Sequence, residues 1–108
     1  MSETQTNYAS YQVRGFYIRP QMMGAIRRYI EEGLQPGDFL TALICNNLRE
    51  SVARADDENM RNLPAYVAYL YNEAPADCWG TKERMADWIK KKRKEREENH
   101  ENRDCNND

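Results

Sequence analysis

Apolar residues recur at intervals of three and four along the first half of the chain, the spacing of one face of an α-helix. The first stripe consists of Met22, Met23, Ile26, Tyr29 and Ile30. Arg19-Pro20 suits the start of a helix, because proline tolerates the first turn, and Gly33 suits a left-handed cap at its end. The pattern therefore predicts a first helix that begins at Pro20 and ends before Gly33.

The stretch from Pro36 to Arg49 is the most apolar in the chain. Asp38 is a good N-cap, because its carboxylate can accept hydrogen bonds from the free N–H groups of a first helical turn. A broad apolar face follows, made of Phe39, Leu40, Leu43, Ile44, Leu48 and Val52. We expect one central helix, which fades out at residues 54–57.

Two further helices are indicated in the second half. Helical periodicity continues through Met60, Leu63, Val67, Leu70 and Tyr71. Pro64 interrupts this third helix and either kinks it or marks its first turn, with Asn62 as the cap. Thr81 is placed to cap a fourth helix, in which Met85, Trp88 and Ile89 share one face.

The two ends of the chain differ from its middle. Residues 11–18 are rich in aromatic and β-branched side chains, which favours an extended segment with one short strand. Residues 1–10 and the charged residues 93–108 offer little to bury, so both are expected to be disordered. The sequence predicts an all-α fold: a compact four-helix domain over residues 11–92, with an extended N-terminal segment and a disordered charged C-terminal tail.

Composition narrows the classes of function. The net charge of −2 over 108 residues makes nucleic acid an unlikely partner. No apolar run is long enough to span a membrane. The three cysteines, at positions 45, 78 and 105, form no CxxC pair, and no signal peptide is evident, so we expect a reduced, cytoplasmic protein.

Catalytic and metal-binding residue patterns are missing from the sequence. The only histidine, His100, lies in the polar tail, so no nucleophile–histidine pair can form in the core. The cysteines and the histidine are too widely spaced for a metal site, and no glycine-rich phosphate loop is present. We therefore expect a protein that is not an enzyme and carries no metal or cofactor.

A basic, aromatic segment is the first candidate binding site. Residues 5–30 contain no Asp or Glu, and Arg14, Tyr17 and Arg19 lie there, followed by Arg27 on the first helix. Guanidinium groups bind phosphate in a planar fork and aromatic rings stack on bases, so this set suits a small anionic nucleotide. Alternatively, the aromatic residues belong to the core and the arginines are solvated.

Two other features could contribute to binding. Asn47 follows Asn46 on the expected central helix, where it shares the face of the apolar residues more nearly than Asn46 does. A core-facing Asn47 would need a hydrogen-bond partner from a loop, a second subunit or a ligand. Trp79 and Thr81 stand at a helix start, where N–H groups attract anions; alternatively, Trp79 closes the core beside a cap.

Several motifs together resemble a widespread set of short phage and prophage proteins. These motifs are Tyr29-Ile30-Glu31-Glu32-Gly33, Pro36-Gly37-Asp38-Phe39-Leu40-Thr41-Ala42, Asn46-Asn47-Leu48, Arg54-Ala55-Asp56, Asn59, Leu63-Pro64, and Pro75 through Trp79-Gly80. The resemblance covers residues 23–89. The phage sequences often have Asp where this chain has Asn47, so a carboxylate role at that position does not carry over.

The resemblance implies a phage protein, and small non-enzymatic phage proteins often counter host defence. One such class consists of oligomeric sponges that sequester cyclic nucleotide immune signals, and this chain is similar to them in size and helicity. We expect a homo-oligomer in the host cytoplasm that binds such a nucleotide without turnover, because the core is also small. The expected contacts are Arg14, Tyr17, Arg19, Arg27 and Asn47, with Trp79 and Thr81. The alternatives are a protein–protein inhibitor of a host defence protein and, less favoured, a nucleic-acid-binding regulator.

Overall fold

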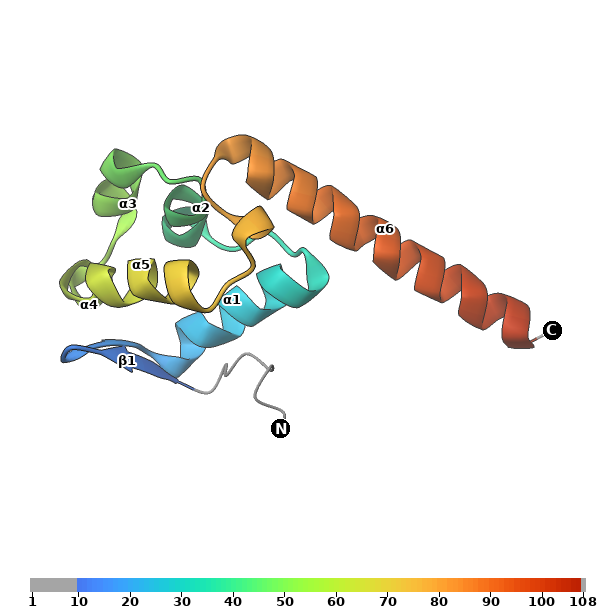
Figure 1. Cartoon of the computed structure of the whole chain (residues 1–108), viewed down its shortest axis with the longest axis horizontal. Coiled ribbons are helices and arrows are strands. Elements are labelled where there is room, and N and C mark those ends of the chain that lie inside the picture. The colour runs from blue at the N-terminus through green and yellow to red at the C-terminus, as the bar shows by residue number, and fades with distance from the viewer. Residues whose placement is uncertain (1–9, 108) are drawn as a thin grey trace.

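A computed structural model describes the backbone of residues 10–107 and side chains as far as Glu98 (Figure 1). The chain is mostly helical, with one small hairpin ahead of the helices. Its elements are β1 (Tyr11–Val13), β2 (Phe16–Ile18), α1 (Pro20–Glu32), α2 (Asp38–Ile44), α3 (Leu48–Arg54), α4 (Asp57–Arg61), α5 (Leu63–Asn72), the 3-10 turn η1 (Ala76–Cys78) and α6 (Lys82–Asn107). The expected disorder of residues 1–9 lies outside the described part of the chain.

The extended N-terminal segment folds back on itself. β1 and β2 pair antiparallel, with Tyr11 opposite Ile18 and Val13 opposite Phe16. Arg14 and Gly15 form the turn with φ angles of 53° and 86°. Positive φ at both central residues is the mark of a type I′ turn, whose twist matches that of the flanking strands. The segment is therefore a two-stranded hairpin, where the sequence predicted one short strand.

The first helix forms as predicted. α1 begins at Pro20 and ends at Glu32, and Gly33 follows it with a left-handed φ of 72°. α6 also passes close to this point, since a Cβ added to Gly33 would lie 2.5 Å from the Cβ of Lys92. Gly33 thus permits both the end of α1 and the close approach of α6.

The prediction of a single central helix is wrong. The chain breaks after α2, where Asn46 adopts a left-handed φ of 62°, and restarts as α3. Asparagine tolerates this conformation better than most residues, and the Asn47 side chain caps the new helix by accepting a hydrogen bond from the Glu50 N–H. The break turns Leu48 out of the core, so that 71% of its surface is exposed.

The third predicted helix is also two helices. α4 ends at Arg61, and Asn62 is the N-cap residue of α5, with Pro64 in the first turn. The structure thus selects the second interpretation of Pro64, in which it marks the start of a helix. The described residues contain six α-helices, so the four-helix arrangement is not the observed one.

Three tyrosines occupy the centre of the core. Tyr29, Tyr66 and Tyr69 are almost fully buried among aliphatic side chains from α1, α2 and α5. Tyr29 donates a hydrogen bond from Oη to the carbonyl oxygen of Cys78 at 2.6 Å. On α6, the Trp88 indole donates to the carbonyl oxygens of Tyr29 and Ile30, which fastens α6 to the end of α1.

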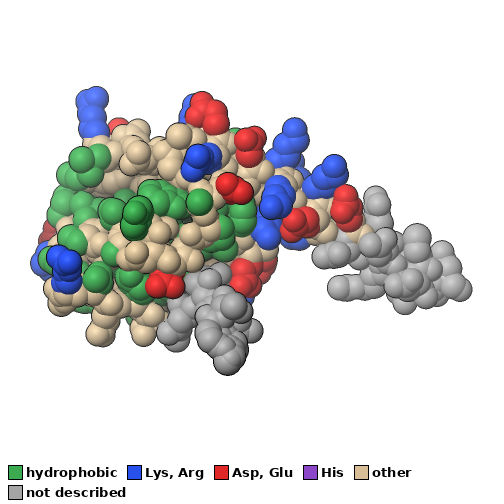
Figure 2. Space-filling view, in the orientation of Figure 1, with side chains coloured by type: hydrophobic (Ala, Val, Ile, Leu, Met, Phe, Trp, Pro, Cys, Tyr) green, Lys and Arg blue, Asp and Glu red, His purple; other side chains and the backbone are tan. Residues whose placement is uncertain are grey.

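α6 extends well beyond the globular body. Thr81 precedes it as predicted and accepts a hydrogen bond at Oγ1 from the Arg84 N–H. The helix then continues to Asn107, through residues for which the sequence predicted a disordered tail (Figure 1). Apolar side chains gather over the body, whereas the described part of the projecting helix carries charged ones (Figure 2). No helix in the described part of the chain has the length and apolar character needed to cross a bilayer.

Candidate functional site

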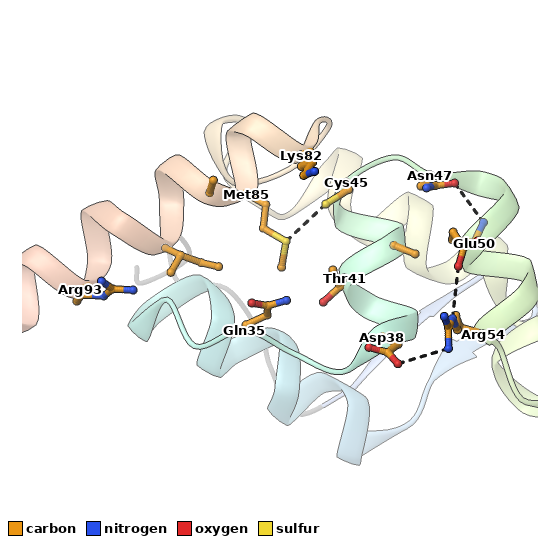
Figure 3. A pocket seen from close by; sticks show the side chains of 13 residues that line it. Gln35, Asp38, Thr41, Cys45, Asn47, Glu50, Arg54, Lys82, Met85 and Arg93 are labelled. Carbon is orange, nitrogen blue, oxygen red and sulfur yellow. Dashed lines mark hydrogen bonds and ion pairs between the residues drawn. The ribbon is translucent and has the colours of Figure 1, made fainter.

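A groove of about 680 Å³ lies between the α2–α3 corner and the first turns of α6 (Figure 3). The groove forms because α2 and α3 meet at a bend, and α6 starts beside the end of α2, where the Gly80 N–H bonds to the Ile44 carbonyl oxygen at 2.8 Å. The side chains that determine its chemistry are Gln35, Asp38, Thr41, Cys45, Asn47, Glu50, Arg54, Lys82, Met85, Ile89 and Arg93.

The middle of the groove is apolar. Met85 and Ile89 come from α6 and Ala42 from α2. Cys45 lies beside them, with its Sγ 3.6 Å from the Sδ of Met85. Burial raises the pKa of the Cys45 thiol, although the positive charge of Lys82 partly opposes this, so the thiol is protonated at neutral pH. A protonated thiol is a poor nucleophile, and this part of the groove is suited to contact with an apolar surface.

The charges of the groove are unevenly paired. On the α2–α3 side, Arg54 lies 3.6 Å from an oxygen of Asp38 and 3.4 Å from an oxygen of Glu50. On the α6 side, Lys82 and Arg93 form no ion pair with any described residue. Their two positive charges are therefore available to an anion in the groove.

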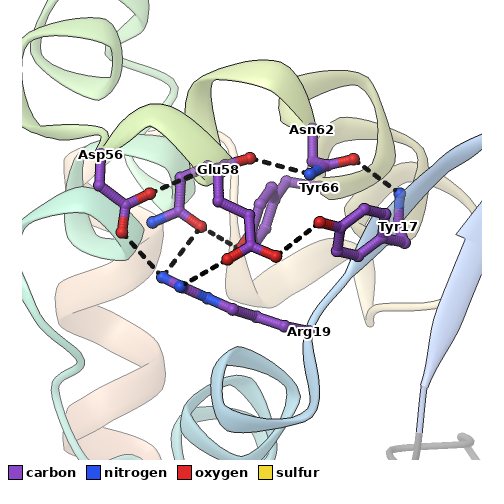
Figure 4. A network of polar contacts seen from close by, with 7 residues as sticks. Tyr17, Arg19, Asp56, Glu58, Asn62 and Tyr66 are labelled. Atoms are coloured by element: carbon purple, nitrogen blue, oxygen red, sulfur yellow. Dashed lines mark hydrogen bonds and ion pairs between the residues drawn. The ribbon is translucent and has the colours of Figure 1, made fainter.

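Arg19 and Tyr17, two of the predicted contacts, instead attach the hairpin to α4 (Figure 4). The Arg19 guanidinium donates to Glu58 at 2.9 Å and to Asp56 at 3.0 Å. Tyr17 Oη donates to the second oxygen of Glu58 at 2.6 Å. This hydrogen bond to Glu58 is the main cause of the raised pKa of Tyr17. These contacts leave both side chains committed to the protein itself.

Two buried asparagines, which the sequence analysis missed, complete this network. Asn59 Oδ1 accepts from Tyr66 Oη at 2.7 Å, and Asn62 Oδ1 accepts from the Tyr17 N–H at 2.9 Å. The Asn62 amide also donates to the Glu58 carbonyl oxygen at 2.8 Å. A signal was present in the sequence, because positions 59, 62 and 66 follow the spacing of one helical face.

The other predicted contacts are not gathered into one site. Arg14 is exposed in the hairpin turn, and Arg27 is exposed on α1 with Glu31 at 3.9 Å. Trp79 packs partly buried against the core, which agrees with its structural interpretation, and Thr81 caps α6. Asn47 alone among the predicted contacts lines the groove, at its rim and not in the core.

Within residues 10–98, no group of three or more His, Cys, Asp or Glu side chains is placed to hold a metal ion. The second cysteine of this region, Cys78, is buried, and burial raises the pKa of its thiol to about 12. What the groove offers chemically is an apolar surface, amide groups and charges of both signs.

Comparison with known proteins gives no assignment: no protein family, no curated protein and no solved structure matches this chain.

Proposed function

We propose that this protein binds a small anionic nucleotide in the groove between α2, α3 and α6 and sequesters it without turnover. The observation that carries the proposal is the pair of cations, Lys82 and Arg93, on the wall of a groove with an apolar middle. The volume of about 680 Å³ is within the range of pockets that hold small ligands, which run from ~300 to ~1,000 Å³.

Each part of a nucleotide has a matching part of the groove. Phosphate oxygens would lie against Lys82 or Arg93, which stand at opposite ends of the groove, about 16 Å apart along α6 (Figure 3). Arg93 can offer two parallel N–H donors. A base or ribose would cover Met85 and Ile89, which removes apolar surface from water. In Figure 3, Arg93 extends from α6 toward Gln35, so that its charge faces the groove.

The biological setting of the proposal comes from the sequence resemblance. We propose a phage protein that acts in the cytoplasm of its host, where the nucleotide would be a cyclic immune signal. Sequestration requires affinity and protein abundance but no catalytic group. A protein of this type lowers the free signal concentration by mass action.

The proposal moves the phosphate contacts away from the N-terminal segment. Arg19 was one of the predicted contacts, but its guanidinium is already neutralised by Asp56 and Glu58. A phosphate there would have to displace two carboxylates. Lys82 and Arg93 present no such competition within the described residues.

Isothermal titration calorimetry with a panel of cyclic mono- and dinucleotides tests the proposal. We expect at least one to bind, and at least one of Lys82→Gln and Arg93→Gln to weaken binding by tenfold or more, as expected for loss of a charge-assisted contact worth ~1.5–3 kcal/mol. Lys94→Gln is the matched control, because Lys94 is exposed on the same helix outside the groove.

Absence of binding by every nucleotide in the panel would refute the proposal. Arg14→Gln adds a second comparison, since Arg14 is remote in sequence from every residue that lines the groove. If that change abolishes binding while Arg93→Gln has no effect, the site lies at the hairpin instead.

Self-association is the second part of the proposal. Large apolar side chains remain exposed on the body: 50% of the Val67 surface and 78% of the Tyr71 surface on α5, and 71% of the Leu48 surface on α3. These exposed apolar side chains are also the observation that favours the alternative function, which is inhibition of a host protein by direct binding. We propose a homo-oligomer, because the single small core leaves these apolar side chains uncovered by the described residues.

A further inference from the structure

The groove has opposite electrical character on its two sides. Lys82 and Arg93 come from α6, whereas Asp38 and Glu50 come from α2 and α3 (Figure 3). The Asp38 and Glu50 carboxylates share one cation, Arg54, so the α2–α3 side retains an excess of negative charge. A simple inorganic anion would use only the α6 side.

The carboxylates on the α2–α3 side remain able to accept hydrogen bonds. Their contacts with Arg54, at 3.6 and 3.4 Å, are longer than the ~2.7–2.9 Å of a strong charge-assisted hydrogen bond. Each contact also uses one oxygen only. Asp38 Oδ1 and Glu50 Oε2 accept no hydrogen bond from the described residues. A ligand with N–H groups can therefore bind here without breaking a tight ion pair.

We infer that the groove selects a nucleotide whose base presents two adjacent hydrogen-bond donors, which among the common bases means guanine. This inference rests on the proposed function and specifies its ligand. Guanine carries N1–H beside its N2 amino group, and one carboxylate can accept from both. Adenine presents its amino group beside N1, which is a hydrogen-bond acceptor. A carboxylate placed there would therefore have one oxygen against the N1 lone pair, and the two acceptors repel each other.

A neutral side chain lies between the two charged sides. The Gln35 amide projects into the groove between Arg93 and Thr41 in Figure 3, and its polar atoms form no hydrogen bond with the described residues. It can donate to the O6 carbonyl of guanine. Its amide oxygen can equally accept from the amino group of adenine at the same ring position, so the preference between the two bases rests on the carboxylates.

The test compares cyclic GMP with cyclic AMP, which carry the same phosphate and ribose, by calorimetry on the full chain. We expect cyclic GMP to bind about tenfold more tightly, because one bidentate contact typically discriminates by ~1–3 kcal/mol. Asp38→Asn and Glu50→Gln keep the side-chain size, and at least one should bring the two affinities within about twofold of each other. Asp57→Asn, at an exposed carboxylate of α4 outside the groove, should leave the ratio unchanged.

The outcomes distinguish the guanine preference from nucleotide binding itself. Equal affinities, tighter binding of cyclic AMP, or a ratio that neither Asp38→Asn nor Glu50→Gln reduces would overturn the guanine assignment and leave nucleotide binding intact. Failure of every nucleotide to bind would remove the proposed function itself. Circular dichroism of each variant shows whether the fold is retained, and Asp38→Glu, which keeps the charge, should retain the preference if Asp38→Asn abolishes it.

Discussion

The role of a charged side chain in this protein depends on which other side chains the fold places next to it. Arg19 and Arg93 have the same chemistry, but Arg19 lies between Asp56 and Glu58 whereas Arg93 has no ion pair with a described residue. A free guanidinium is a candidate for ligand binding, and a neutralised one stabilises the fold. The distinction depends on the surroundings of each side chain and not on its identity.

Asp56 should make stability depend on pH in the acid range. Its pKa is lowered, first by the hydrogen bond from the Asn59 N–H and then by Arg19, so folding favours the ionised carboxylate. A depressed pKa adds stability above the unfolded-state pKa of about 3.9, and this stability is lost as pH falls through the folded-state value. Urea unfolding of the wild type should show a decline below about pH 4 that is smaller in Asp56→Asn. Identical pH profiles would contradict the role given to Asp56.

Gly33 should be the glycine least tolerant of substitution. Gly33→Ala places a Cβ on a left-handed residue, 2.5 Å from the Cβ of Lys92, so α6 must shift. We expect a loss of about 1–3 kcal/mol in the free energy of unfolding, measured by urea denaturation. Gly37→Ala is the control, because Gly37 has a negative φ and nothing lies within 4 Å of its added Cβ. Similar losses for both variants would show that the α6 contact is unimportant.

At the scale of elements, the break between α2 and α3 determines where the groove lies. A continuous helix through residues 38–54 would carry Glu50 and Arg54 along the α2 axis. The left-handed Asn46 and the cap at Asn47 instead fold α3 against α2 and place both charged residues beside Asp38. The polar pair in the apolar stretch thus marks a helix boundary.

The contribution of the Asn47 helix cap to the free energy of unfolding should be measurable. Asn47→Ala removes the acceptor of the Glu50 N–H bond, and we expect it to cost about 0.5–2 kcal/mol of unfolding free energy. Asn47→Asp should keep nearly all the stability because aspartate caps equally well. Chemical denaturation compares the three proteins. Equal stability of Asn47→Ala and the wild type would mean that the break does not depend on this cap.

At the scale of the whole molecule, the apolar side chains that α5 exposes bear on whether the protein self-associates. The helical periodicity placed Val67 and Tyr71 in the core, yet α5 turns them to the surface and buries Tyr66 and Tyr69 instead. Both sides of α5 carry apolar residues, and one small body can cover only one of them.

Self-association should depend on this surface of α5. We expect the wild type to sediment as more than a monomer in analytical ultracentrifugation, and Val67→Glu combined with Tyr71→Ser to shift it toward the monomer. Leu34→Ser is the control, since Leu34 is a large apolar residue exposed in the loop between α1 and α2. A wild type that remains monomeric at high concentration would contradict the prediction.

The sequence by itself determined the features that depend on neighbouring residues. Pro20 and Gly33 set the ends of α1, and Thr81 set the start of α6. These signals are local, because capping, backbone φ and periodicity involve residues a few positions apart.

Only the tertiary structure decided which side chains meet. The groove joins Asp38 and Glu50 to Lys82 and Arg93 across more than thirty positions of sequence, and the hairpin joins Arg19 to Glu58 in the same way. No periodicity encodes such pairs, because they follow from how the helices cross and from the left-handed bend at Asn46. For this reason the sequence could not show that Arg19, one of the predicted contacts, lies between Asp56 and Glu58.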